Sequence, residues 1–407
     1  MKRKILIALA AVGPGLFLIG YNIGTGSITT MAKAGANYGM TLFWALLLSA
    51  LFTYILMVAY GQVTLVTGHT ALYNIRKHFK LGTVLAVYIL IALVTGELLA
   101  IMGVMGIVVD LILEGIRLMG WGEADAFRVT LVLVIGLFAL LWFGKYKLFE
   151  KILTFFVILM GLCFILVFFL VKPDFGAIAR GMVPSIPEGD GAFQLIAAMA
   201  GTTCSAAVFV VRSTVVAEKG WTIENLKDEK KDAFVSAGMM LLLSGIIMAV
   251  SAGTLYVMGL SLDTTVEMIH LFEPLGGKVA AFILILGIVG AGLSTVFPII
   301  LIAPWLISDF AGKSRDIKSP MFRILGFIGL LFGFGLIFIE KTPPAMMIFS
   351  QAFQAMILPA VAIPILILIM NKNLMGKHVA RTRMKTGLIA VIIFSLITTY
   401  FAIIDLI

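Results

Sequence analysis

Long apolar runs alternate with short polar segments along almost the whole chain. Each run is about as long as the roughly 20 apolar residues that cross a bilayer, so the pattern predicts an all-α polytopic membrane protein with eleven transmembrane helices. The predicted spans are Ile5–Lys33, Met40–Val66, Leu81–Val109, Phe127–Phe143, Ile152–Val171, Phe193–Ala217, Ala233–Leu260, Lys278–Ile307, Phe322–Ile339, Ala345–Met370 and Thr386–Leu406.

Two of these runs, the first and the sixth, are interrupted by small polar residues. The first breaks at Gly24, Thr25, Gly26 and Ser27, and the sixth breaks after Gly201 at Thr202, Thr203, Cys204 and Ser205. Glycine and β-branched threonine are poor helix formers. A break inside a bilayer is tolerated only where the backbone lines a cavity or is buried in protein. The breaks therefore predict a substrate site, and close helix packing through small residues is the alternative.

Charge and composition narrow the class of protein. Of the 407 residues, 61% are hydrophobic and only 13% are charged, which leaves no room for a soluble enzyme domain. The net charge of +9 does not indicate nucleic-acid binding, because Lys and Arg are concentrated in alternate loops. By the positive-inside rule, this alternation predicts a multi-pass protein of the plasma membrane with a cytoplasmic N-terminus and an extracytoplasmic C-terminus.

The matching positions of the two breaks predict an inverted repeat of five helices, as in transporters of the LeuT type. Residues 1–407 then form one membrane transport domain. Residues 5–171 are the first repeat, 193–370 are the second, and 386–406 are an extra peripheral helix.

Few ionisable side chains lie inside the predicted spans. Glu97 in span three and Arg212 in span six are costly in a bilayer, so we expect them to pair and to act as a gate or coupling element below the site, or to be purely structural. Gln351 or Gln354 in span ten should face the interior of the bundle, where it lines the site or makes a plain interhelical hydrogen bond. The sequence shows no nucleophile–base arrangement and no cofactor motif, which argues against an enzyme.

Gly13-Pro14-Gly15, the AGANYGMTLFW stretch ending at Trp44, and the segment Ser350–Gly376 together resemble the Nramp family of divalent-metal transporters. The resemblance implies metal-cation transport, yet the metal-ligand motifs differ. The Asp-Pro-Gly-Asn of the family is replaced here by Gly24, Thr25, Gly26 and Ser27, and its Met-Pro-His by Ser205, Ala206 and Ala207. The soft sulfur ligand is thereby lost, unless Cys204 takes its place.

These replacements leave the identity of the substrate open. Without carboxylates at the breaks, a divalent ion would keep much of its hydration shell, which favours Mg²⁺ over Mn²⁺ or Fe²⁺. Gln351 and Cys204 are the candidate protein ligands. A carrier of a small carboxylate such as an amino acid is the alternative, because a glycine-rich helix start binds anions. The expected partners are the lipid bilayer, a small ion or solute, and a coupling ion, either H⁺ or Na⁺.

Overall fold

The computed structural model describes residues 24–143, 146–188, 191–312 and 316–404, and every regular element in these ranges is a helix. The first part of the chain runs through α3 (Thr25–Tyr38), α4 (Phe43–Thr67), α5 (Ala71–His78), α6 (Gly82–Leu118), α7 (Ala126–Phe143), α8 (Tyr146–Leu170) and α9 (Phe175–Arg180). The middle part comprises α10 (Ala192–Thr203), α11 (Ala206–Glu218), the 3₁₀ turn η1 (Ile223–Asn225), α12 (Leu226–Gly253), η2 (Val266–Leu275) and α13 (Gly277–Phe310). The chain ends with α14 (Pro320–Leu331), η3 (Phe332–Ile337), α15 (Pro343–Met370), α16 (Lys372–Met375), η4 (Gly376–His378) and α17 (Thr382–Ile404).

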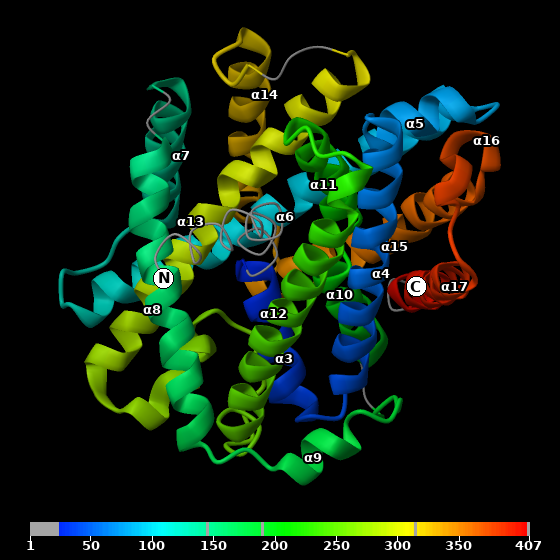
Figure 1. The fold of residues 1–407 in the computed structure, drawn as a ribbon. Helices are drawn as coiled ribbons and strands as arrows, with labels where there is room; N and C mark the ends of the chain where they lie inside the picture. The colour runs from blue at the N-terminus through cyan, green and yellow to red at the C-terminus, as the bar shows by residue number, and fades with distance from the viewer. Residues whose placement is uncertain (1–23, 144–145, 189–190, 313–315, 405–407) are drawn as a thin grey trace, which may run out of the picture.

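The predicted spans correspond to these helices. Ten helical segments of the described residues are long and apolar enough to cross a membrane, and they match the predicted spans two to eleven. For span one, the structure describes only the second half, α3, and the first half lies outside the described residues. The helices α5 and α16, which carry basic residues, lie at one end of the molecule, opposite α9 (Figure 1).

Two boundaries differ from the prediction in ways that matter for the charged residues. The connection expected between the third and fourth predicted spans begins within α6, because α6 continues past Asp110 to Leu118. The connection expected between the sixth and seventh predicted spans, residues 218–232, is helical in its second half, because α12 begins at Leu226. Charged residues such as Glu and Lys form helices well where a helix extends beyond the apolar core of the bilayer. Hydropathy alone therefore ends α6 too early and starts α12 too late.

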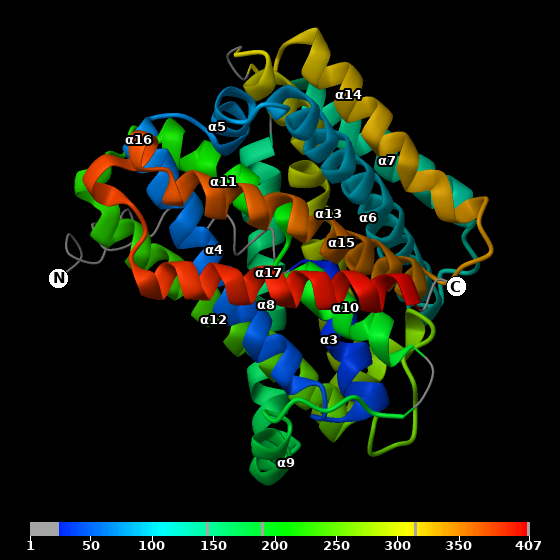
Figure 2. The same cartoon turned by 90° about the vertical axis from the view of Figure 1, so that its right-hand side faces the viewer.

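The sixth span is broken, as predicted, and lies in the centre of the bundle. Helix α10 ends at Thr203, and neither Cys204 (φ −110°, ψ 48°) nor Ser205 (φ −65°, ψ 128°) has helical dihedral angles. Thr53 of α4 donates its hydroxyl to the freed carbonyl of Thr203 at 2.8 Å, which satisfies a backbone group that lipid could not. Helix α17 instead crosses the outside of the bundle over α10, α15 and α4 (Figure 2), in the peripheral position predicted for the extra helix.

Helix α15 carries two internal prolines and stays continuous, and hydroxyl groups of neighbouring helices bond to carbonyls near these prolines. Pro359 has no N–H for the carbonyl of Ala355, and the hydroxyl of Thr399 on α17 lies 3.4 Å from that oxygen. The hydroxyl of Tyr60 on α4 donates to the carbonyl of Val361 at 2.9 Å. These bonds fix α15 against α4 and α17, and α15 carries Gln351.

Close approach of α10 to α15 gives a first testable prediction. A methyl group on Gly201 would press into the backbone of Gln351 and lie 3.0 Å from the amide nitrogen of Ala355. Gly201→Ala should therefore destabilise the protein by about 1–3 kcal/mol, as overpacking does. Gly238→Ala on α12 is the matched control, because no atom lies within 4 Å of its added methyl. Thermal unfolding in detergent should show a fall for the first variant and no fall for the second, and equal stability of the two would contradict the packing.

Candidate functional site

A small cavity lies where the break of span six faces the start of α3. Its volume is about 40 Å³. The cavity is lined by the helix start at Gly24, Gly26 and Ser27, by Thr202 and Ser205 at the second break, and by residues of α6, α13 and α15, namely Glu97, Ala100, Val104, Thr295, Ile299, Met347, Gln351 and Gln354. The two breaks predicted from sequence thus meet at one site.

Glycine at the start of α3 is required by the crowding around this cavity. A methyl group on Gly24 would lie within 2.8 Å of the Thr295 hydroxyl, and one on Gly26 would lie 2.8 Å from Nε2 of Gln351. Gly24 caps α3 with an extended backbone (φ −89°, ψ −171°) and without a side-chain hydrogen bond. The first N–H groups of α3 therefore begin at the cavity wall.

The cavity contains a carboxylate, which corrects the expectation of a site without one. Glu97 of α6 is 3% exposed, and its Oε1 accepts a hydrogen bond from Nε2 of Gln354 at 2.9 Å. Gln354 Oε1 in turn accepts from the hydroxyl of Ser205 at 3.4 Å. These hydrogen bonds join α6, α15 and the second break. Glu97, the one acidic residue among the described lining residues, therefore lies at the cavity itself and not below it.

The cavity also contains a thioether that the sequence analysis missed. Met347 lies one helical turn before Gln351 on α15, and Nε2 of Gln351 lies 3.5 Å from the Met347 sulfur. The same sulfur would lie 3.3 Å from a methyl group on Gly26, so it faces the start of α3. The spacing of four residues places Met347 on the same helix face as Gln351, and this spacing was the sequence signal that could have identified Met347. A sulfur atom is therefore present at the site, supplied by span ten.

The structure brings most, but not all, of the predicted site residues to the cavity. Gly24, Gly26, Ser27, Thr202, Ser205 and Gln351 line it, whereas Thr25, Thr203 and Cys204 are not among its lining residues. Cys204 is fully buried. No group of three or more His, Cys, Asp or Glu side chains that could hold a metal occurs in the part of the chain that the structure describes.

The predicted ion pair between Glu97 and Arg212 is wrong. Arg212 is fully buried and pairs with two acidic residues at the start of α12. Its Nε donates to Oε1 of Glu229 at 2.8 Å, and its Nη2 donates to Oδ2 of Asp232 at 2.8 Å. The sequence analysis treated both acids as loop residues, although their spacing of three places them on one face of a helix. Arg212 is thus held by its neighbour span and not by span three.

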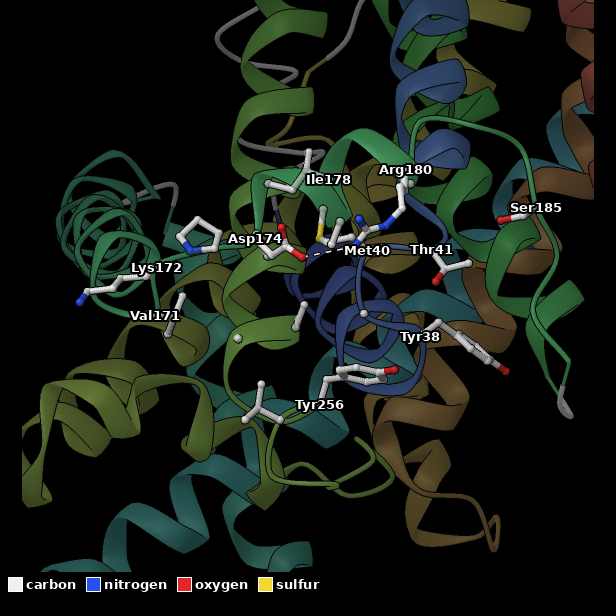
Figure 3. A pocket seen from close by; sticks show the side chains of 18 residues that line it. Tyr38, Met40, Thr41, Val171, Lys172, Asp174, Ile178, Arg180, Ser185 and Tyr256 are labelled. Carbon is white, nitrogen blue, oxygen red and sulfur yellow. Dashed lines mark hydrogen bonds and ion pairs between the residues drawn. The ribbon is translucent and has the colours of Figure 1, made fainter.

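A second and larger cavity of about 660 Å³ lies at the α9 end of the molecule (Figure 3). It is lined by the α3–α4 turn, the end of α12 and α9, and it shares no lining residue with the cavity at the breaks. Asp174 and Arg180 form an exposed ion pair of 3.3 Å on its wall. The pKa of Asp174 is held below its usual value, mainly by hydrogen bonds from the backbone N–H groups of Ala177 and Gly176 and to a smaller extent by Arg180. The cavity at the breaks remains the candidate substrate site, because, unlike the cavity near α9, it is lined by both the start of α3 and the break of span six.

The two cavities are separated by α3, whose far end is fixed by an ion pair. Lys33 Nζ lies 3.1 Å from Oδ1 of Asp263, in the segment before η2. Hydrogen bonds from Ser261, which has the larger effect, and from Lys33 keep the pKa of Asp263 below its usual value. The contact ties the half-helix that begins at the cavity to the connection between α12 and α13.

A bundle of membrane-spanning helices that encloses a small polar cavity between the start of α3 and the interruption of span six has the architecture of a carrier. Residues 15–405 match the family described as Natural resistance-associated macrophage protein-like, so the chain belongs to the Nramp family, whose members are membrane transporters and not enzymes.

Known relatives cover nearly the whole chain. It is 24% identical over 388 residues to a protein named Divalent metal cation transporter MntH from Pectobacterium carotovorum, covering 93% of this chain and 89% of the relative. The identity to the protein of the same name from Yersinia enterocolitica is 25% over 394 residues, covering 92% and 89%.

Solved structures show that the fold is shared. The manganese transporter of Eremococcus coleocola has a TM-score of 0.74 at 16% identity, with 98% of this chain and 86% of that chain covered. Mhp1, a nucleobase-cation-symport-1 family transporter, has a TM-score of 0.60 at 13% identity, with 97% and 92% covered. The predicted LeuT-type fold is therefore confirmed.

Proposed function

We propose that this protein carries a divalent metal cation across the plasma membrane through the cavity at the two breaks, with Mg²⁺ as the favoured substrate. The observation that carries the proposal is the buried carboxylate of Glu97 on the cavity wall. A buried anionic group attracts a cation strongly where water is scarce. The names of the MntH relatives and family membership support a metal as that cation.

The chemistry of the cavity wall favours a hard cation. Glu97 offers carboxylate oxygens, Gln351 and Gln354 offer amide oxygens, and the hydroxyls of Ser27 and Ser205 add two more. Mg²⁺ prefers such oxygen ligands. Met347 contributes one weakly donating sulfur among these oxygens.

The size of the cavity limits how much water can accompany the ion. A single water needs about 10–15 Å³ of such space, so a cavity of about 40 Å³ takes an ion with one or two waters. A fully hydrated ion does not fit in this conformation. We therefore propose that protein oxygens replace most of the hydration shell, with Glu97 as the anionic ligand, instead of the largely hydrated ion expected from the sequence.

A small carboxylate solute remains the second candidate, because of the helix starts at the cavity. Gly24 caps α3, Ser205 caps α11, and both residues line the cavity. Helix N-termini attract anions. The Glu97 carboxylate opposes a second anion, and a cavity of this size is far below the roughly 300 Å³ of a typical organic-ligand pocket.

Thermal unfolding of the purified protein separates the two candidates, because a ligand that binds the native state raises the melting temperature. We expect Mg²⁺ to raise it in a concentration-dependent manner and amino acids or small carboxylates to leave it unchanged. Stabilisation by a carboxylate solute and not by any metal would refute metal transport.

Binding of Mn²⁺ gives a further prediction about selectivity. Since the described residues that line the cavity offer a single carboxylate and no imidazole, we expect no tight binding of Mn²⁺. Isothermal titration calorimetry is the measurement. A low-micromolar dissociation constant for Mn²⁺ would contradict this prediction, and its loss in Met347→Leu would then identify the thioether as a ligand.

Topology can be tested with single cysteines at Asp263 and Arg381. Both positions are exposed, and they lie in connections that charge alternation assigns to opposite sides of the membrane. The native Cys163 and Cys204 are buried, so they should not react. We expect a membrane-impermeant thiol reagent to label intact cells at 263 and not at 381. Labelling of both positions from outside would overturn the assignment of the N-terminus to the cytoplasm.

A further inference from the structure

Met347 of α15 lies in the wall of the cavity at the breaks, and its side chain is completely buried. Glycines of two other helices confine it. A methyl group on Gly103 of α6 would lie 3.2 Å from Cε of Met347, and one on Gly26 of α3 would lie 3.3 Å from its sulfur. A methionine side chain is flexible and normally adapts to its surroundings. Here the close approach of α6 and α3 holds the sulfur in one position beside the start of α3.

The sulfur of Met347 faces two polar side chains of its own helix. Nε2 of Gln351 lies 3.5 Å from the sulfur. The hydroxyl of Ser350 lies 3.8 Å from it, but donates at 2.8 Å to the backbone carbonyl of Met347. A thioether has no hydrogen to donate and can only accept a hydrogen bond, weakly. The sulfur therefore favours the nitrogen end of the Gln351 amide as its neighbour and disfavours the oxygen end.

The amide of Gln351 can point either way unless its surroundings choose between the two ends, because the nitrogen and the oxygen are almost identical in shape. Nε2 is also the atom of this amide that approaches Gly26, at 2.8 Å from the position of an added methyl. With the nitrogen placed between Met347 and the start of α3, the oxygen points away from both. Gln351 is only partly buried and lines the cavity, so Oε1 is the end of the amide left to face a ligand there.

The neighbouring amide of Gln354 is oriented by the same kind of contact. Its Nε2 donates to the carboxylate of Glu97 at 2.9 Å, and its Oε1 lies 3.4 Å from the hydroxyl of Ser205. An ionised carboxylate, like a thioether, can only accept. The two glutamines are three residues apart and thus share one face of α15. A thioether carries no charge, so Met347 can orient an amide without adding a second anion to the cavity wall.

We propose that Met347 is a positioning residue for cation binding. Its sulfur holds the amide of Gln351 with the nitrogen beside α3 and with Oε1 turned toward the cation. Without the sulfur, the amide is free to rotate and to present its N–H groups, which repel a cation. In this role Met347 acts on the cation through Gln351. The effect on metal binding rests on the proposed function, whereas the orientation of the amide does not.

Nuclear magnetic resonance of the purified full-length protein in detergent micelles tests the orientation without any metal. The chain contains four glutamines, namely Gln62, Gln194, Gln351 and Gln354. Selective ¹⁵N labelling of glutamine therefore gives few side-chain amide signals, and the signal that Gln351→Glu removes belongs to Gln351. Met347→Leu conserves the volume of the side chain and removes the acceptor. We expect it to shift the Gln351 signal and to speed the exchange of its amide hydrogens with water.

Met346→Leu is the matched control for this measurement. Met346 is a buried methionine of the same helix and is not among the described residues that line the cavity. We expect the Gln351 signal and its hydrogen exchange to stay as in the wild type in this variant. An unchanged signal and exchange rate in Met347→Leu would overturn the proposal, whatever the protein transports.

Calorimetry with Mg²⁺ tests the consequence for binding. Met347→Leu should lower the affinity about tenfold, as loss of a residue that orients a ligand does. A carboxylate has an oxygen at both ends, so glutamate at position 351 needs no orientation. Adding Met347→Leu to Gln351→Glu should therefore cost no further affinity. An equal loss in both backgrounds would refute positioning and indicate direct contact of the sulfur with the cation. Absence of Mg²⁺ binding in the wild type would count against the proposed function, and the amide signals would still decide the orientation.

Discussion

Glu97→Gln should lower the affinity for the transported metal by at least about tenfold and stop transport. It removes the carboxylate from the cavity wall and keeps the shape of the side chain. Even residues that only support a metal ligand are worth about 10–100-fold in affinity, and Glu97 is the one acidic side chain among the described residues that line the cavity. Calorimetry with Mg²⁺ and uptake into proteoliposomes are the measurements.

Glu114→Gln is the matched control, because it neutralises a carboxylate on the same helix outside the cavity. We expect wild-type affinity and uptake for this variant. The amide introduced by Glu97→Gln can still accept the hydrogen bond from Gln354, so the melting temperature without metal should change little in that variant. Equal metal affinity in Glu97→Gln and wild type would remove the main support for a cation site.

Arg212→Ala should destabilise the protein by about 3–5 kcal/mol, since it leaves buried acidic groups without their partner. Adding Asp232→Asn should recover part of this loss, because Asp232 lies 2.8 Å from the guanidinium. Adding Glu97→Gln should give no recovery, and the two effects should add within about 0.3–0.5 kcal/mol, as for independent sites. Denaturant unfolding in detergent micelles measures each free energy of unfolding.

These two double-mutant cycles, Arg212→Ala with Asp232→Asn and Arg212→Ala with Glu97→Gln, distinguish the observed ion pairs of Arg212 from the pair with Glu97 expected from the sequence. Strong coupling of Arg212 to Glu97 together with additivity between Arg212 and Asp232 would contradict the structure. Coupling of Arg212 to Asp232 together with additivity between Arg212 and Glu97 would show that the ion pairs of Arg212 hold α11 against α12.

Several features of the site follow from local sequence. Gly24 and Gly26 start α3, and Cys204 and Ser205 interrupt span six, because backbone preference at a break depends mainly on the residues at the break. Gln351 faces the interior because a buried amide in an apolar helix needs partners. Met347 was accessible to the same reasoning through its spacing of four residues from Gln351, yet methionine is so common in apolar helices that its spacing alone does not distinguish a ligand.

The sequence by itself determined the helical spans, the two breaks and the alternation of charge between loops. Each depends on whether a short stretch suits lipid or water, and that preference is a local property. The pairing of charged groups was decided by the tertiary structure. Glu97 meets Gln354 across 257 residues of sequence, while Arg212 meets Glu229 only 17 residues away, on a helix that hydropathy had assigned to a loop. A buried charge takes the partner that packing brings within hydrogen-bond distance, and hydropathy contains no information about which helices are neighbours.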